Sequence, residues 1–408
     1  MYAGSNVTLM DVTRTVTCVK ELVETTIATL QNSVSSVFNN MGVPHEHELV
    51  LPLMGQFESA KQMFDDIDTP FKMNTHFSEK FHLIKPKEIF LGHRADTVRK
   101  QGQVKHVLAP DTCQYIPILE TIKFLFSNDQ MQGVYLKTKK RNDNMMRDYS
   151  DGCQFSSHQG FQLYPESLQI QLYYDDVETT NPLGSKTKIH KMGAVYFTLR
   201  NLPPECNSSL AHIHLCVLFN SFDRETYGLG KILEPLLEDI RVLENCGIEV
   251  EVNGQTQKLR GTLSILTADN LAIHQLCGYV ESFSANKFCQ FCLIDKQEIQ
   301  SVFDEDNVVK RSRENYEQHV RFCNPSSTGV EGNSCLNSLQ YFHVTENTCV
   351  DIMHDVLEGV APLEVKLLLR HFIYEEKLFT LEQLNDRIAG FDYGYMNDKK
   401  CHYQFEIF

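Results

Sequence analysis

The sequence predicts an α/β protein in which a mixed β-sheet follows a mainly helical N-terminal region. The sheet is predicted from residues 168–269, where three strand-like segments, a helix and a fourth strand-like segment follow one another. The helical region is predicted from residues 9–38, where apolar residues recur every three or four positions.

Each predicted strand has its own pattern. Apolar and polar residues alternate in SLQIQLYYDD, which predicts a half-buried first strand. KMGAVYFTLRNLPP and AHIHLCVLFNS predict the second and third strands. The amphipathic segment LGKILEPLLEDIRVLENCG predicts a helix capped by Gly247. A hairpin at Asn253-Gly254 then leads into an apolar fourth strand that ends at Asp269.

Turn residues and polar segments divide the chain. The N-terminal region contains two further predicted helices, at 56–66 and 112–127, and ends in KTKKRNDNMMRDYSDG. The final residues, CHYQFEIF, do not resemble the end of a natural domain, so we expect the core to continue beyond them. Four regions are expected: a helical N-terminal region (1–150), the first part of the core (151–280), an insertion (281–345) and a helical end of the core (346–408).

The composition is that of a globular protein, with 42% hydrophobic and 22% charged residues in 408. No window approaches the ~18 apolar residues of a membrane span, and the N-terminus lacks a signal-peptide pattern. We therefore expect no membrane partner. The net charge of -15 opposes strong nonspecific DNA binding, although basic residues outnumber acidic ones between Lys80 and Lys105.

Acidic residues stand at the ends of two predicted strands. Asp175 and Asp176 end the first strand, and Asp269 ends the fourth. Mg²⁺ prefers carboxylate oxygens on rigid supports, and two such ions can stabilise the attacking and leaving oxygens of a phosphoryl displacement. Ordinary solvated loop acids are the alternative interpretation.

The segment VDIMHDVLEGV places an imidazole among three carboxylates. Asp351, His354, Asp355 and Glu358 share one face if the segment is an α-helix. Because the first and last of them are then about 10.5 Å apart along the axis, only one fits a small metal site. We assign that role to Glu358 and place His354 at the zinc or in support. A solvated acidic face is the alternative.

Two of the 13 cysteines, Cys289 and Cys292, form the only CxxC motif. This motif supplies half of a tetrahedral zinc site. Three downstream histidines, His319, His343 and His354, are candidates for the other half. Two buried thiols without a metal are the alternative.

Three ordered blocks resemble the CACTA (Tnp2-type, En/Spm-like) family of DNA transposases, in particular an animal transposon-derived member. LYYDDVETTNPLGSKTKIHKMGAVYFTLRNLPP resembles the first-aspartate block of that family. LTADNLAIHQLCGYVESFSANKFCQFC resembles its second-aspartate block, and VDIMHDVLEGV resembles its third.

The resemblance implies an RNase H-like fold with a DDE/D site for Mg²⁺ or Mn²⁺. It implies Asp175 as the first acid, with Asp176 as the alternative, and Asp269 as the second. For the third acid it leaves a choice between Glu358, which we prefer, and Asp355.

The resemblance also implies a structural Zn²⁺ in the insertion. By analogy with the V(D)J recombinase, His354 or, less closely, His343 would complete the site begun by the CxxC motif. The N-terminal region departs from the family pattern, because it has no CxxC…HxxxH spacing for binding element ends.

The function implied by the resemblance is cut-and-paste transposition in the nucleus, by metal-dependent cleavage and strand transfer of DNA at transposon ends. The partners would be DNA and, as a further option, copies of the same chain. A domesticated, non-catalytic nuclear protein that binds DNA or protein is the alternative function. A nuclease unrelated to transposition is a third.

Overall fold

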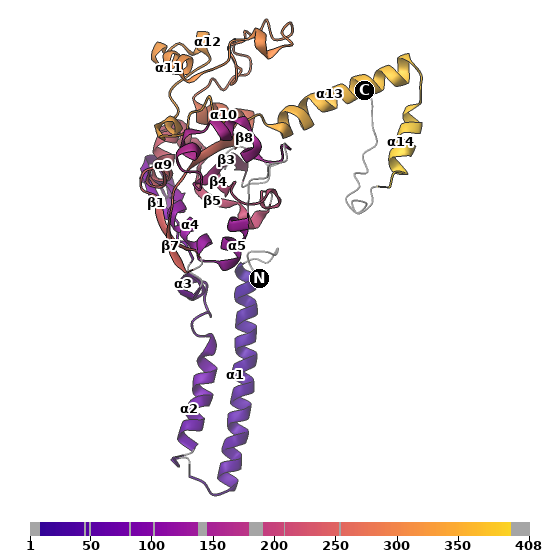
Figure 1. Ribbon diagram of the computed structural model, residues 1–408. Helices are drawn as coiled ribbons and strands as arrows, with labels where there is room; N and C mark the ends of the chain where they lie inside the picture. The colour runs from indigo at the N-terminus through magenta and orange to yellow at the C-terminus, as the bar shows by residue number, and fades with distance from the viewer. Residues whose placement is uncertain are drawn as a thin grey trace. The chain divides into compact units, whose positions relative to one another are not determined.

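Figure 1 shows the computed structural model, which describes residues 9–392 apart from 45, 49, 81–82, 101–102, 138–144, 179–190, 208 and 253. The chain divides into two compact units, 1–85 and 86–408. Several sequence features lie outside the described residues: the Asn-Pro pair of the first-aspartate block, the basic part of the polar boundary segment, Asn253 and the final CHYQFEIF.

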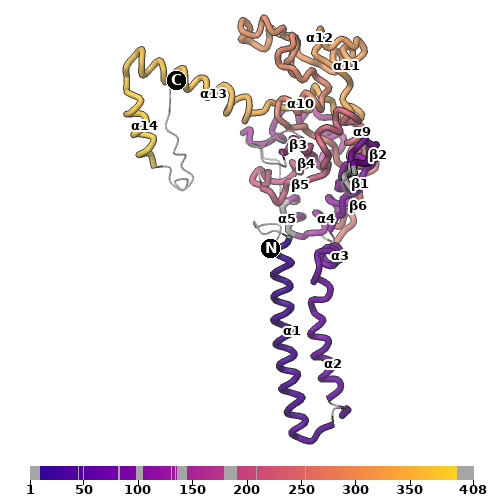
Figure 2. The backbone as a smooth tube through the Cα atoms, turned by 180° about the vertical axis from the view of Figure 1, so that it is seen from behind, coloured from indigo at the N-terminus to yellow at the C-terminus, as the bar shows by residue number. Residues whose placement is uncertain are grey.

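The first unit is a helical hairpin. Helix α1 (Leu9–Asn40) and helix α2 (Val50–Lys61) lie side by side (Figures 1 and 2). The first agrees with the helix predicted at 9–38, whereas the second begins before the helix predicted at 56–66 and ends at Lys61. Lys20 of α1 donates to the carboxylates of Asp65 and Asp68 at 2.8 and 3.1 Å, which ties the hairpin to the loop after α2. The unit also contains η2 (Gln62–Phe64) and α3 (Pro70–Lys80).

A long β-hairpin lies inside the stretch that we expected to be mainly helical. Strands β1 (Lys87–Lys100) and β2 (Gln103–Tyr115) pair along their whole length. The helix expected at 112–127 begins only at α4 (Ile118–Phe126), because Pro117 disfavours helical conformation in the residue before it. Helix α5 (Asp129–Lys137) follows.

The second unit contains a six-stranded mixed sheet in the order β1-β2-β5-β4-β3-β8. Neighbouring strands are antiparallel except β3 and β8, which are parallel. The predicted α/β class is therefore confirmed, with the first strand of the core inside the sheet and flanked by the fourth. These strands are β3 (Leu168–Glu178), β4 (Lys191–Leu199), β5 (His214–Asn220) and β8 (Gly261–Ala268).

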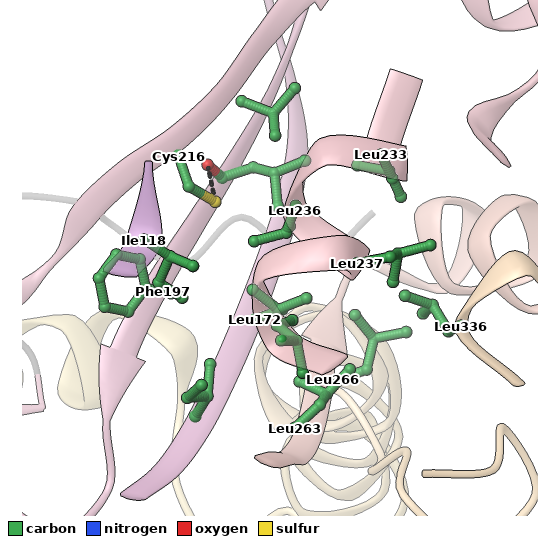
Figure 3. Packing of buried hydrophobic residues seen from close by; sticks show 14 of the residues in the cluster. Ile118, Leu172, Phe197, Cys216, Leu233, Leu236, Leu237, Leu263, Leu266 and Leu336 are labelled. Atoms are coloured by element: carbon green, nitrogen blue, oxygen red, sulfur yellow. Dashed lines mark hydrogen bonds between the residues drawn. The ribbon is translucent and has the colours of Figure 1, made fainter. Parts of the chain in front are cut away.

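Helix α9 (Leu229–Asn245) provides the crossover that a parallel pair requires. Its leucines Leu233, Leu236 and Leu237 pack in one core with Leu172 of β3 and Leu266 of β8 (Figure 3). Burying each such side chain contributes about 1.5–3 kcal/mol. As predicted, the helix stops before a glycine with positive φ, and the hairpin β6 (Ile248–Val252) and β7 (Gln255–Leu259) follows.

After β8 the chain forms α10 (Asn270–Cys277) and enters the insertion, where α11 (Arg313–Phe322) interrupts the predicted loops. It returns beside β8 through a parallel bridge between Leu266 and Thr348. No helix among the described residues is long and apolar enough to span a membrane. The remaining helices are α6 (Cys153–Ser157), α7 (Gln159–Leu163), α8 (Ser221–Tyr227), α12 (Pro325–Thr328), η8 (Ile352–Val360), α13 (Ala361–Arg370), η9 (His371–Glu375) and α14 (Leu381–Ala389), with short 3-10 turns between them.

The buried Asn347 fixes this return to the sheet. Its Nδ2 donates to the carbonyl of Ser264 at 3.0 Å, and its Oδ1 accepts from the backbone of His343 at 2.9 Å. We expect Asn347→Ala to lower the free energy of unfolding by about 1–3 kcal/mol, because it leaves buried polar groups without partners. Urea unfolding measures this effect. The exposed Asn333→Ala should change stability by less than about 0.5 kcal/mol, and an equal effect of the two changes would contradict the assignment.

Candidate functional site

Two acids follow the last register pair of β3 and β8, in which Tyr174 is the partner of Ala268. Asp269 comes just after the end of β8, whereas Asp175 remains within β3, opposite Ala194 of β4. The expectation that Asp175 and Asp176 end the first strand is therefore wrong, because β3 continues to Glu178. Asp269 also caps α10, since its Oδ1 accepts from the backbone of Ala272 at 2.6 Å. Asp175 is therefore the candidate first acid that lies next to Asp269 in the register, and its role as a metal ligand stays a prediction.

Asp176 lies on the other side of the sheet, because side chains alternate along a strand. Its Oδ1 accepts from the hydroxyls of Tyr174 and Ser221 at 2.9 and 2.8 Å. Arg224 approaches its other oxygen at 3.7 Å. Asp176 thus belongs to a hydrogen-bond network between β3 and α8, and the structure does not bring it to Asp269.

Tyr173 shares the face of Asp175. Its hydroxyl donates to Oδ2 of Asp175 at 3.4 Å. Burial, followed by the charges of Asp175, Asp269 and Asp351, raises the pKa of Tyr173 to about 12. Burial also raises the pKa of Asp175, and the charge of Asp269 adds to this rise. Tyr173 thus contacts Asp175 and is affected by the charges of Asp269 and Asp351. The sequence analysis did not identify it, although its place two residues before Asp175 puts it on the same face.

Asp351 connects this group to the helix that follows. It caps η8 by accepting at Oδ1 from the backbone of Met353 and His354 at 3.0 and 3.2 Å. Its Oδ2 bonds to Nδ1 of His354. This hydrogen bond raises the pKa of His354, and the charges of Asp351, Glu358 and Asp269 act in the same direction. His354 is thus placed among the acids.

The α-helical face predicted for this segment is not formed, because residues Ile352–Val360 form a π-helix. In a π-helix the hydrogen bond joins i to i+5, so residues four or five apart lie above one another. Glu358 therefore stays one turn from His354, whereas Asp351 stands outside the helix as its cap. Gly359 permits this winding, since a Cβ there would lie 2.8 Å from the carbonyl of His354.

Asp355 has a different environment from Glu358. Its Oδ1 accepts from Nδ2 of Asn270 at 2.5 Å, and its Oδ2 accepts from the backbone of Asp351 at 3.2 Å. It therefore holds the start of η8 against α10. Glu358 is exposed.

The CxxC motif forms a tight turn in the insertion. The backbone N–H of Phe291 donates to Sγ of Cys289 at 3.4 Å. Burial raises the pKa of Cys292, and the neighbouring thiol of Cys289 adds to the rise. Arg311 holds the turn by donating to the carbonyl of Cys289 at 2.8 Å.

The candidate histidine ligands lie in different surroundings. His319 presents a buried Nδ1 that has no hydrogen-bond partner among the described residues. Burial and the charges of Arg311 and Lys287 lower its pKa. His343 is buried with Nδ1 on Oγ1 of Thr345 at 2.8 Å, and its Nε2 also lacks a partner in the described part of the chain.

Among the described residues, neither the acidic candidates nor the cysteine and histidine candidates are arranged around a metal position. Within the described ranges, no group of three or more His, Cys, Asp or Glu side chains is arranged to hold a metal ion. The structure brings together Asp175, Asp269, Asp351 and His354, and separately Cys289 and Cys292. It does not join His343 or His354 to the cysteines in one ligand group.

Comparison of the chain with protein-family models and with curated proteins finds no match.

The ion pair between Asp351 and His354 predicts a pH dependence. Because the pKa of His354 is raised, the pair stabilises the start of η8 below about pH 6.5, and this contribution is lost as the pH rises through the raised pKa. NMR titration of the imidazole should give a pKa above its ordinary value in the unmodified chain and a lower one in Asp351→Asn. An unchanged pKa in that variant would contradict the pairing.

Proposed function

We propose that the chain carries the RNase H-like core of a DDE/D transposase that cleaves and joins DNA, and that it acts in the nucleus. One observation carries the proposal: Asp175 and Asp269 directly follow the last register pair, Tyr174 with Ala268, of two parallel strands in a mixed sheet. The strand order, with the crossover helix between β5 and β8, supports it. So does the sequence resemblance of the three blocks to the CACTA family.

The donor set fits Mg²⁺ or Mn²⁺. Asp175 and Asp269 offer hard carboxylate oxygens, and the charge of Asp269 makes ionisation of Asp175 less favourable, an effect that a bound cation offsets. These two residues would hold the ion, with Glu358 as the third acid. Such an ion supplies Lewis-acid stabilisation of the phosphate and activates water.

Asp351 is better suited to positioning than to binding metal. Both of its oxygens are occupied, one by the helix cap and the other by His354. Glu358 is exposed and lies one turn along η8 from His354, whose pKa its charge raises. The proposed third acid is therefore Glu358, with Asp351 and His354 fixing the start of its helix.

A zinc ion in the insertion is a second part of the proposal. Cys289 and Cys292 lie in one tight turn and their thiols affect each other's ionisation, which supports them as half of a tetrahedral site. The unpartnered buried nitrogens of His319 and His343 make these two histidines the candidates for the remaining ligands, although the described residues do not gather them with the cysteines into one ligand group. The His354 of the original expectation is assigned to the acidic group instead. The role of the zinc would be structural.

Two adjacent aspartates provide a matched test of the catalytic proposal. Asp175→Asn and Asp269→Asn should each reduce Mg²⁺- or Mn²⁺-dependent cleavage of duplex DNA by more than about 100-fold, since even outer-shell changes at metal sites cost about 10–100-fold. Asp176→Asn should retain cleavage and lower only the thermal stability, because Asp176 faces the network with Ser221. Equal loss in Asp175→Asn and Asp176→Asn would contradict the assignment of the first acid.

The same assay separates the third-acid candidates. Glu358→Gln should abolish cleavage while the fold persists, whereas loss with Asp355→Asn and retention with Glu358→Gln would move the third acid to Asp355. An unmodified chain that folds and binds DNA without cleaving it in either metal would favour the non-catalytic alternative.

Metal analysis tests the zinc proposal. Protein purified without chelators should contain about one zinc per chain, and the double change Cys289→Ser with Cys292→Ser should remove it. The exposed Cys246→Ser is the matched control and should keep the metal. Loss of zinc in His319→Ala or His343→Ala identifies the remaining ligands, and an unmodified protein without zinc after growth in zinc-containing medium would refute the site.

A further inference from the structure

The hairpin of β1 and β2 continues as a two-stranded ribbon beyond the sheet. The two strands pair from Lys87 with Tyr115 to Lys100 with Gln103. Strand β2 pairs with β5 only at Gln114 and Tyr115 over the part of the chain that the structure describes. From Gly92 outward the ribbon spans roughly 27 Å, at about 3.4 Å per residue.

The base of the ribbon is held firmly. The buried Asp111 accepts from Arg94 and, at 2.9 Å, from the hydroxyl of Tyr227. Lys231 of α9 donates to the carbonyl of Leu91 at 2.5 Å. Gly92 lies so close to the ring of Tyr227 that a Cβ there would be 2.4 Å from it. These contacts fix the direction in which the ribbon leaves the sheet.

Beyond this base the ribbon is exposed and basic. Residues 93–97 and 104–108 are exposed. Three basic residues stand against the single acidic Asp96 in the segment from 95 to 105, in a chain whose net charge is -15. The basic residues are Arg99, Lys100 and Lys105, whereas Arg94 is paired with Asp111 at the base.

The strand register relates the ribbon to the acids. Asp175 pairs with Ala194, Ala194 with Leu218, Leu218 with Gln114, and Gln114 with Glu88. Because each of these four neighbouring pairs is antiparallel, β1 runs in the same direction as β3. Strand β1 therefore continues past the level of Asp175, in the direction in which β3 runs toward its carboxyl end.

We propose that this β1–β2 ribbon is a binding surface for duplex DNA, which it enters through the major groove. That groove is about 12 Å wide and admits a two-stranded ribbon, and the basic residues complement the phosphates that border it. The inference rests on the proposed function, because it names the surface that presents DNA to the acidic site.

Binding of a fluorescein-labelled B-form DNA duplex, followed by fluorescence anisotropy without divalent metal, tests the ribbon separately from cleavage. The ribbon variant combines Arg99→Gln, Lys100→Gln and Lys105→Gln. It should weaken binding and reduce the slope of log K against log salt by about 2–3, since each phosphate contact contributes about 0.9. The control changes three lysines exposed elsewhere, Lys123→Gln, Lys258→Gln and Lys366→Gln, and should bind like the unmodified chain. Thermal melts check that both fold.

Three results would overturn the inference: unchanged DNA binding in the ribbon variant, equal weakening in the control, or displacement of the DNA by polyglutamate as effectively as by unlabelled duplex. The last would assign the ribbon to an acidic protein partner. Ribbon-dependent binding by a chain that never cleaves would remove the proposed catalysis and leave the ribbon as a DNA-binding element. Cleavage by the unmodified chain, with unchanged binding in the ribbon variant, would support the proposed catalysis and remove the ribbon as a DNA-binding element.

Discussion

The parallel pairing of β3 with β8 is the constraint on which the candidate site depends. Parallel neighbours cannot be joined by a tight turn, so the chain must leave the sheet and return through α9. The leucines of α9 make that return favourable by burying apolar surface against both strands. Because the two strands run in the same direction, the residues that follow their last register pair, Asp175 within β3 and Asp269 after β8, become neighbours. A substitution that leaves a cavity in this core would therefore disturb the positions of the two acids without contacting either of them.

Carboxylates that lie close together disfavour each other's charged forms, and the two aspartates of β3 differ in this effect. The pKa of Asp175 is raised by burial and by Asp269, whereas Asp176, one residue later, has hydroxyl donors from Tyr174 and Ser221. The alternation of a strand thus separates two identical residues into a carboxylate whose charged form is disfavoured and a carboxylate whose hydrogen bonds are satisfied. The first arrangement suits a cation and the second suits a structural link, which is why burial and partners identify a candidate better than residue type does.

The sequence was sufficient for the strands of the core because their alternation, the prolines that end β4 and the glycine after α9 are local signals. It was not sufficient for the hairpin of β1 and β2, since a ribbon exposed on both faces has no apolar alternation to detect. It also misjudged the helix after Asp351, because spacing of three and four predicts an α-helix and the π-helical winding depends on the close approach that Gly359 permits. The face shared by Tyr173 and Asp175 could have been found from their spacing, but the nearness of Asp351 depends on the return of the chain beside β8.

A cluster of carboxylates repels the phosphate backbone that a DNA-cleaving site must approach, and a net charge of -15 adds to that repulsion at long range. Under the proposed function, attraction would therefore come from a basic surface that is separate from the acids and held in a fixed position relative to them. The sheet provides that relation: four strand spacings, roughly 19 Å at about 4.8 Å each, separate Asp175 from its level partner Glu88, and the basic part of β1 begins beyond that point. Because Asp111, Tyr227 and Lys231 clamp the base of the ribbon, its offset from the acids is set by the fold and not by the flexibility of a linker. The β1–β2 hairpin was not predicted from the sequence. Its positive charge is nevertheless the feature that best explains how an acidic protein would approach DNA.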